Sequence, residues 1–441
     1  MLNRKIYNTL KEWKLSANKK PLIIKGCRQC GKTFSVMHFA KENYRHVVYV
    51  NFVQNPDYAL AFKDSKMVDD ITMNISAMSA DATFVPRETC IVLDEIQECP
   101  EARTALKFFQ IDGRFDVIAT GSLLGVKGYG QRRDVKASVP VGYETIVNMY
   151  PLDFEEFLWA NGISEQIINK IGECLSEVTP VPEALHQRMK QLMLQYTIVG
   201  GMPEAVNTFI ATHDIGQVQN IQRAIINEYE DDMVKYADDA DKSRIRECFE
   251  SIPRQLSKEN KKFQYSVVRK GGKAAQYGGS IQWIEDAGII CRCRNLDIPE
   301  LPLDGNATED VFKIYMADTG LFVSMLEEGT AFDILQGNLY AYKGAIFENL
   351  IADIFNKMQR KLYYFRKDSG LEVDFVMRYK GESTLVEVKA SNGNTKSTRT
   401  ILAHPEKYHV SQAIKLGDYN VGRNEQLLTL PLYMAFMLKE Y

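Results

Sequence analysis

Eight residues near the N-terminus, Gly26-Cys-Arg-Gln-Cys-Gly31-Lys32-Thr33, have the spacing of a phosphate-binding loop, G-x-x-x-x-G-K-[ST]. Gly26 and Gly31 allow backbone N–H groups to turn toward phosphate oxygens. Lys32 adds a full positive charge at the β- and γ-phosphates, and the Thr33 hydroxyl can bind Mg²⁺. An apolar run at 21–25 precedes the loop and a helical pattern follows it. This context predicts a nucleotide site between a strand and a helix.

A second candidate feature lies at the end of the apolar run Cys90-Ile-Val-Leu-Asp94-Glu95. Ligands of open parallel sheets gather at the carboxyl ends of strands, where Asp94 is expected. We expect Asp94 to hold Mg²⁺ and Glu95 to orient or deprotonate the attacking water. The alternative is that both residues belong to a solvated turn.

A third apolar run ends at Ala119-Thr-Gly-Ser122, and Arg132 and Arg133 follow it. Ser122 could hydrogen-bond the γ-phosphate or the attacking water, or the segment could be a simple strand-to-loop turn. Either arginine could act as an arginine finger. We favour the alternative that the two arginines are a solvated basic pair.

The C-terminal third contains paired carboxylates with a lysine. Asp374 lies in the alternating run Glu372-Val-Asp374-Phe-Val-Met, and Glu387-Val-Lys389 follows in another. Alternation places Glu387 and Lys389 on one face of a strand, where a paired strand could bring Asp374 alongside. Two carboxylates bind Mg²⁺, and a neighbouring lysine can orient a water. Glu348, on the preceding predicted helix, could complete the cluster. The alternative is a buried ion cluster in a domain that does not cut.

A basic segment spans 254–294. It contains nine Lys and Arg against three acidic residues, a local charge of +6 in a chain whose net charge is −3. The run 277–290 is typical of the last helix of a winged helix and its wing, which can bind duplex DNA. Within it, Trp283 and Ile284 are expected in the core, and Ser280 and Gln282 facing outward. The alternative is that the basic residues form a solvated face on a domain that only packs against the P-loop domain.

The elements expected to position these residues are mixed α/β. Apolar runs alternate with helical patterns in the first third, which favours a parallel sheet covered on both faces. We expect a P-loop domain at 1–150, a helical lid at 151–240, a winged-helix-like segment at 241–305 and a second α/β domain at 306–441.

Composition narrows the function classes. The 441 residues contain no stretch of about 18 uninterrupted apolar residues, so no membrane partner is expected and the location is expected to be cytoplasmic. The eight cysteines are expected to be free thiols. Cys27 and Cys30 fall inside the phosphate loop, which argues against a metal site there.

Several of these motifs together resemble a family of prokaryotic AAA-type P-loop ATPases. The matching pieces are Gly26–Thr33, Leu93-Asp-Glu-Ile-Gln97, Ala119–Ser122, Tyr150-Pro-Leu-Asp-Phe-Glu-Glu-Phe157, Gly200-Gly-Met-Pro-Glu204 and Glu387-Val-Lys389. The resemblance implies ATP and Mg²⁺ as cofactors, a winged-helix region, and a C-terminal restriction-endonuclease-like domain with a D…E-x-K site. Val373 stands where that site commonly has proline.

We therefore expect an enzyme that binds and hydrolyses ATP with Mg²⁺ and couples hydrolysis to binding double-stranded DNA through 254–294. An ATP-gated, Mg²⁺-dependent DNA nuclease is one alternative. A slow nucleotide switch that binds DNA without cutting is the other. The sequence leaves the oligomeric state open, and no second-sensor arginine can be placed in it.

Overall fold

The computed structural model describes every residue except 123–141, 237–238, 259–260, 339–341, 390–394 and 440–441. Arg132 and Arg133 lie outside the described residues. The chain divides into two compact units. The first comprises residues 4–150 and 235–242, and the second comprises 1–3, 151–234 and 243–441. No helix within the described ranges is long and apolar enough to cross a membrane.

The first unit is built on a five-stranded parallel sheet with the order β2-β3-β4-β1-β5. Its strands are β1 Leu22–Lys25, β2 His46–Asn51, β3 Thr89–Asp94, β4 Asp116–Gly121 and β5 Thr145–Asn148. Its main helices are α1 Ile6–Leu15, α2 Lys32–Asn43, α3 Val68–Met78 and α4 Pro100–Asp112, with short 3-10 turns η1 Pro56–Phe62 and η2 Ile96–Glu98.

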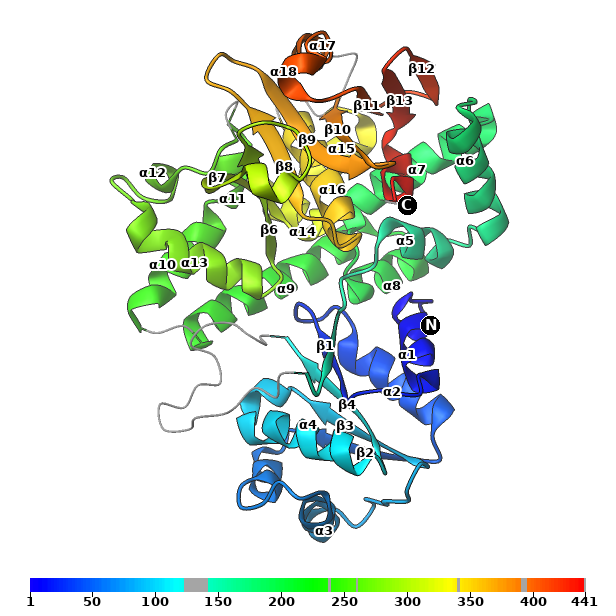
Figure 1. Ribbon diagram of the computed structural model, residues 1–441, viewed down its shortest axis with the longest axis vertical. Coiled ribbons are helices and arrows are strands. Elements are labelled where there is room, and N and C mark those ends of the chain that lie inside the picture. Colours follow the sequence, from blue (N-terminus) through cyan, green and yellow to red (C-terminus); the bar gives the residue numbers. More distant parts are fainter. Residues whose placement is uncertain (123–141, 237–238, 259–260, 339–341, 390–394, 440–441) are drawn as a thin grey trace. The chain divides into compact units, whose positions relative to one another are not determined.

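Each face of this sheet carries its own apolar core, because successive residues of a strand point to opposite faces. On β3, Ile91 and Leu93 pack with residues of α3 and α4. Cys90 and Val92 pack with residues of α1 and α2. Figure 1 shows the resulting three layers of helix, sheet and helix. This confirms the expected α/β class with a parallel sheet covered on both faces.

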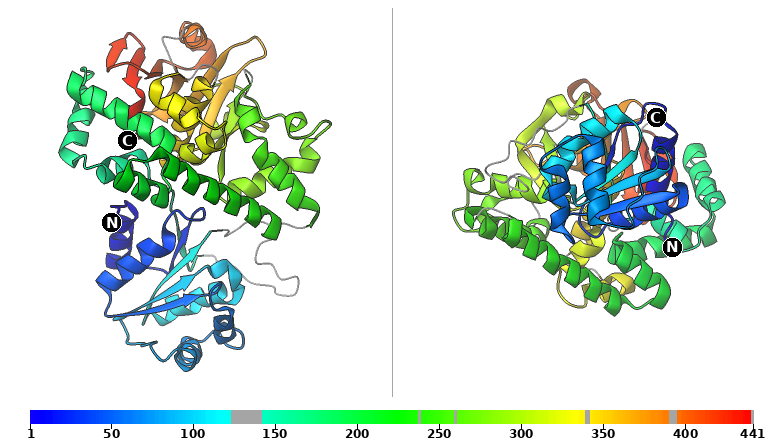
Figure 2. Two further views of the ribbon diagram at one scale, coloured as in Figure 1. Left: turned by 180° about the vertical axis from the view of Figure 1, so that it is seen from behind. Right: turned by 90° about the horizontal axis from the view of Figure 1, so that it is seen from below.

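The second unit begins with a series of helices (Figures 1 and 2). They are α5 Phe154–Ala160, α6 Glu165–Glu177, α7 Glu183–Val199, α8 Pro203–Thr212, α9 Ile215–Tyr236, α10 Asp239–Glu250, α11 Ile252–Leu256, α12 Tyr265–Val268 and α13 Ala274–Asp286. Asp153 starts α5 with a capping box, in which its side chain accepts a hydrogen bond from the Glu156 N–H and the Glu156 carboxylate accepts one from the Asp153 N–H.

A mixed eight-stranded sheet follows, with the order β12-β13-β11-β10-β9-β8-β6-β7. The strands are β6 Ile290–Leu296, β7 Ala307–Met316, β8 Leu362–Arg366, β9 Glu372–Tyr379, β10 Glu382–Val388, β11 Gln412–Gly417, β12 Gly422–Asn424 and β13 Leu427–Pro431. The remaining helices are α14 Thr319–Ser324, α15 Thr330–Gln336, α16 Lys343–Lys357, α17 Lys396–Leu402, α18 Pro405–Tyr408, η3 Leu303–Asn306 and η4 Leu432–Met437.

The hairpin β6–β7 is part of this sheet. β6 pairs antiparallel with β7 on one side and parallel with β8 on the other. The border expected at 305/306 therefore falls inside a hairpin. The hairpin expected as a wing is an integral part of the sheet, because its inner edge has a strand partner.

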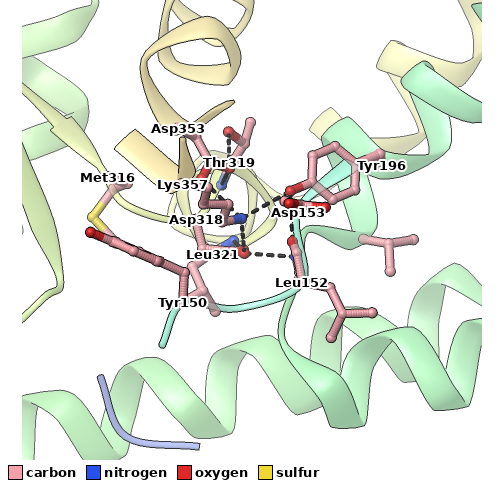
Figure 3. A network of polar contacts seen from close by, with 12 residues as sticks. Tyr150, Leu152, Asp153, Tyr196, Met316, Asp318, Thr319, Leu321, Asp353 and Lys357 are labelled. Atoms are coloured by element: carbon pink, nitrogen blue, oxygen red, sulfur yellow. Dashed lines mark hydrogen bonds and ion pairs between the residues drawn. The ribbon is translucent and has the colours of Figure 1, made fainter. Parts of the chain in front are cut away.

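A buried ionic network joins α7, α14 and α16 (Figure 3). The Lys357 ammonium lies 2.9 Å from Asp353, 3.3 Å from Asp318 and 2.9 Å from the Tyr196 hydroxyl. All four residues are buried. Buried charges are costly unless they are paired and hydrogen-bonded, and each charge here has an opposite partner.

The same network explains two sequence motifs to which no chemistry is assigned. The Asp318 carboxylate accepts a hydrogen bond from the Gly201 N–H at 2.7 Å. The Tyr196 hydroxyl donates to the Leu152 carbonyl at 2.8 Å. A Cβ on Gly200 would lie 2.1 Å from Asp318, and one on Gly201 would lie 2.0 Å from the Leu152 carbonyl. Both glycines are therefore required for packing.

Candidate active site

The phosphate loop connects β1 to α2. Its conformation requires glycine at two positions. A Cβ on Gly26 would lie 2.1 Å from the Met149 carbonyl oxygen. Gly31 has φ 95°, a left-handed conformation that suits glycine. The Lys32 ammonium donates to the carbonyls of Gly26 at 3.0 Å and Cys27 at 2.8 Å. The lysine is thus folded over its own loop, within reach of the space that phosphates would occupy.

Arg4 is a residue of this loop's surroundings that the sequence analysis did not identify. Its guanidinium is buried and donates to the Cys30 carbonyl at 3.0 Å and to the Tyr150 carbonyl at 2.6 Å. It therefore fixes the loop to the segment that follows β5. A single arginine in the polar N-terminal segment carries no motif, so the sequence offered no signal for it.

Asp94 is buried at the carboxyl end of β3, and neutral donors surround its carboxylate. Thr33 donates to it at 2.9 Å, Tyr49 at 2.8 Å and Asn51 at 2.9 Å, and the Thr120 hydroxyl also contacts it. Burial raises the pKa of Tyr49 to about 12, so its hydroxyl keeps its proton at neutral pH. No donor among these contacts carries a charge.

The sequence analysis missed Tyr49 and Asn51, although a signal for them exists. Asn51 pairs in register with Asp94 on the neighbouring parallel strand. Carboxyl ends of parallel strands meet at one edge of a sheet, so polar residues ending the run 46–52 belong to the same site. Tyr49 is two residues earlier and lies on the same face as Asn51.

Glu95 follows Asp94 in a left-handed conformation, with φ 56°. Its carboxylate accepts hydrogen bonds from the Ser122 hydroxyl at 3.3 Å and from the Gln97 amide. Its backbone N–H donates to the Thr120 hydroxyl at 3.4 Å. The ends of β3 and β4 thus meet at Glu95. A non-glycine residue with positive φ is uncommon and recurs at functional sites.

The residues present fit a magnesium ion with a nucleotide. The Thr33 hydroxyl and the Asp94 carboxylate are in direct contact, and both are oxygen ligands of the kind that Mg²⁺ takes. None of the hydrogen-bond donors to Asp94 is a cation, which leaves its carboxylate available for one.

The C-terminal carboxylates are also brought together. β9 and β10 pair antiparallel with Phe375 opposite Val386, and continuing this register places Asp374 opposite Glu387. The Asp374 carboxylate accepts a hydrogen bond from the Val388 N–H at 2.8 Å. Lys389 forms an ion pair with Glu387 at 2.7 Å, and the Thr398 hydroxyl also donates to Glu387.

Glu348 is held differently from the aspartate at the phosphate loop. It is buried on α16, forms an ion pair with Lys313 at 3.0 Å, and also contacts the Lys261 ammonium and the Tyr315 hydroxyl. Burial raises its pKa, but the two lysines outweigh burial and hold the pKa at about 2. Lys313 also pairs with Glu372 at 2.9 Å. The sequence analysis counted Lys261 only in the basic segment 254–294, and it did not identify Lys313.

Asp374 has the opposite shift. Burial, together with the negative charge of Glu348, raises its pKa to about 6, although Lys313, Lys261 and Lys389 act against that shift. Among the described residues, no group of three or more His, Cys, Asp and Glu side chains is arranged to hold a metal ion.

Several cations of the basic segment 254–294 lie beside acidic side chains, which reduces the net positive charge of its surface. Lys261 contacts Glu348, Arg269 lies 3.8 Å from Glu247, Arg294 lies 3.2 Å from Glu309, and Arg292 contacts Glu285. Arg254, Lys258, Lys270 and Lys273 are exposed. Trp283 and Ile284 are buried, as expected.

Of the two α13 residues predicted to face outward, one is exposed and the other is buried. Gln282 is exposed and donates to Asp286 at 2.8 Å, but Ser280 is buried. Ser280 is three residues before Trp283 and four before Ile284, so it shares their buried face.

Three family models match the chain. Residues 18–158 match an AAA domain, residues 190–331 match a domain of unknown function (DUF8612), and residues 343–433 match a second domain of unknown function (DUF4143). The chain therefore contains an AAA-type P-loop domain within residues 18–158. No curated protein matches it.

Two solved structures are similar at low identity. The Walker-type ATPase PABY2304 of Pyrococcus abyssi is 15% identical, with a TM-score of 0.42, over 74% of this chain and 96% of that one. The ORC1 protein of Aeropyrum pernix in complex with DNA is 11% identical, with a TM-score of 0.26, over 76% of this chain and 90% of that one. These values are too low to add to the AAA-domain match.

Proposed function

We propose that this chain, which contains an AAA-type P-loop ATPase domain, hydrolyses ATP with Mg²⁺ and couples hydrolysis to binding of duplex DNA. The observation that carries the first part is the set of neutral donors around Asp94. A buried carboxylate that keeps its charge beside the Thr33 hydroxyl is suited to a magnesium–nucleotide complex.

Each residue of the loop then has a role. The Lys32 ammonium leaves the Gly26 and Cys27 carbonyls and binds the β- and γ-phosphates. Thr33 and Asp94 would hold a magnesium ion, which would offset charge on the phosphates. Glu95 accepts a proton from the attacking water, and Gln97 and Ser122 orient its carboxylate.

The DNA part of the proposal is supported by the exposed cations near α13. Arg254, Lys258, Lys270 and Lys273 are exposed on the helices and turns of 252–286. The short helices α11 and α12 and the helix α13 precede the hairpin β6–β7, which is the element order of a winged helix, but here the hairpin also belongs to the large sheet. The four cations would contact phosphates, which gives affinity without sequence specificity.

A nuclease is the second candidate, and one observation favours it. Asp374, Glu387 and Lys389 lie together across β9 and β10. The lysines on Glu348 argue against it, because they supply the positive charge that a metal would otherwise bring. We therefore prefer a DNA-binding ATPase that does not cut.

The test measures hydrolysis of ATP with and without Mg²⁺, and with and without duplex DNA. We expect magnesium-dependent hydrolysis and DNA binding that weakens with salt. About four phosphate contacts predict a slope of log affinity against log salt of roughly −3 to −4. Absence of hydrolysis would refute the ATPase, and absence of DNA binding at low salt would refute the coupling. Cleavage of plasmid or linear DNA with Mn²⁺ or Mg²⁺ would favour the nuclease.

A further inference from the structure

The phosphate loop contains two cysteines that its nucleotide chemistry does not use. Cys27 and Cys30 occupy variable positions of the G-x-x-x-x-G-K-[ST] pattern. Arg28 and Gln29 form a turn between them, and Gln29 has φ 59°. The first and fourth Cα atoms of a β-turn lie within about 7 Å, and disulfides span about 4.4–6.8 Å between Cα atoms. The upper limit on the Cα separation across such a turn is therefore close to the range that a disulfide spans.

The side chains face each other in this turn. The Cys27 thiol hydrogen-bonds the Cys30 sulfur, and the Cys30 sulfur lies 3.6 Å from the Met149 carbonyl oxygen. The Cys27 contact, together with the charges of Lys32 and Arg4, lowers the pKa of Cys30 to about 6 against the effect of burial. Cysteines in C-x-x-C pairs beside cations and helix N-termini favour the thiolate, which is the reactive form.

The other cysteines give a contrast within the same molecule. Burial raises the pKa of Cys99 and of Cys248 to about 12. It also raises the pKa values of Cys90, Cys291 and Cys293. These five thiols stay protonated at neutral pH, so an oxidant that acts on thiolates would select the loop pair over them.

We propose that Cys27 and Cys30 are a modification site at which a peroxide forms a disulfide and thereby blocks nucleotide binding. The Cys30 thiolate attacks a peroxide oxygen, which breaks the O–O bond and leaves a sulfenic acid and one water after protonation. The Cys27 sulfur then displaces the hydroxyl group as a second water and closes the S–S bond. Two thiols lose two electrons and two protons, and one hydrogen peroxide gains them.

Closing this bond has to move the loop. An S–S bond is about 2.05 Å long, so the two sulfurs must approach by more than about 1 Å from hydrogen-bond contact. The Cys27 carbonyl binds Lys32, and the Cys30 carbonyl binds Arg4. Binding sites require their groups to be placed within about 0.5 Å. The bond would therefore displace the backbone that binds phosphates, and this second part of the inference rests on the proposed ATP site.

The experiment treats the full chain with hydrogen peroxide, which is small enough to approach a buried pair. Intact-mass and peptide-mass spectrometry measure the disulfide, and a fluorescent ATP analogue measures affinity before oxidation, after it and after dithiothreitol. We expect a Cys27–Cys30 disulfide, at least a tenfold loss of affinity, and recovery with dithiothreitol. Cys27→Ala/Cys30→Ala should keep its affinity after peroxide, whereas Cys99→Ala, the matched control, should lose it as the wild type does.

Three outcomes separate the parts of this inference. If other thiols oxidise but no Cys27–Cys30 disulfide forms, the proposal that this pair is a modification site is wrong. If the disulfide forms but the ATP affinity is unchanged, the proposal that the disulfide blocks nucleotide binding is wrong. A reduced protein that binds no ATP would instead overturn the proposed function, and the mass measurement would still decide whether the disulfide site exists.

Discussion

Two buried carboxylates, Asp94 at the end of β3 and Glu348 within α16, are stabilised in opposite ways. Hydroxyl and amide groups solvate Asp94, and they leave its negative charge uncompensated. Two lysines and a tyrosine hydroxyl surround Glu348 and cancel its charge. Both residues were candidates for magnesium chemistry on sequence grounds. The comparison shows that the charge of the partners, more than the carboxylate itself, decides whether a buried acid can take a cation.

The largest effect is expected at the phosphate loop. Lys32→Ala removes the cation nearest the β- and γ-phosphates, so ATP affinity should fall by roughly 100-fold or more. Isothermal titration with ATP and Mg²⁺ measures it. The matched control is Lys41→Ala on the same helix, which should bind ATP as the wild type does. Equal affinity in wild type and Lys32→Ala would contradict the assignment of the loop.

Glu95→Gln tests the base while leaving the loop intact. The amide keeps the shape and the contact with Ser122, but it accepts no proton. The turnover number should fall about 10²–10⁴-fold, with ATP affinity unchanged. Steady-state hydrolysis and direct binding measure the two quantities. A parallel loss of affinity would mean that Glu95 supports the loop instead of the chemistry.

The charge balance at Glu348 predicts a stability effect. Lys313→Met leaves a buried carboxylate short of a partner, so the free energy of unfolding should fall by about 3–5 kcal/mol. Adding Glu348→Gln should recover much of that loss, because the pair is then removed as a whole. Lys361→Met, at an exposed ion pair with Asp304, should change stability by about 1 kcal/mol or less. Urea denaturation measures all four proteins, and an equal loss in the single and double variants would refute the pairing.

The smallest effect is expected at Asp374. Its pKa of about 6 lies above the unfolded value of about 3.9, so the folded chain binds an extra proton between these values. This residue's contribution to stability therefore falls as the pH rises from about 4 to 6 and stays low above 6. Asp374→Asn should stabilise the protein by about 1–2 kcal/mol at pH 7.5 and by little at pH 4.

Glu348 supplies the opposite pH dependence at that site. Its pKa of about 2 lies below the unfolded value of about 4.3, so its contribution is present above that value. The contribution is lost as the pH falls toward 2. Denaturation curves from pH 3 to 8 separate the two residues. If Asp374→Asn destabilised the protein at pH 7.5, the carboxylate would be a net stabilising group, contrary to its raised pKa.

The sequence by itself determined the phosphate loop and the elements that flank it. The spacing of Gly26, Gly31, Lys32 and Thr33 is local, and the apolar strand and helix on either side are local patterns too. The ends of β3 and β4 could also be predicted from local apolar runs. Asp94, Glu95 and Ser122 lie at these strand ends, so their positions could be predicted too. The alternation of β9 and β10 also indicated that Asp374 and Glu387 could share a face.

Only the tertiary structure decided which partners these residues have. Lys261 is 87 residues from Glu348, and Tyr49 is 45 from Asp94, so no local pattern relates either pair. The incorporation of β6–β7 into the large sheet likewise depends on β8, which begins at Leu362. The charge state of a buried acid depends on everything packed around it, and that packing is set by the fold as a whole.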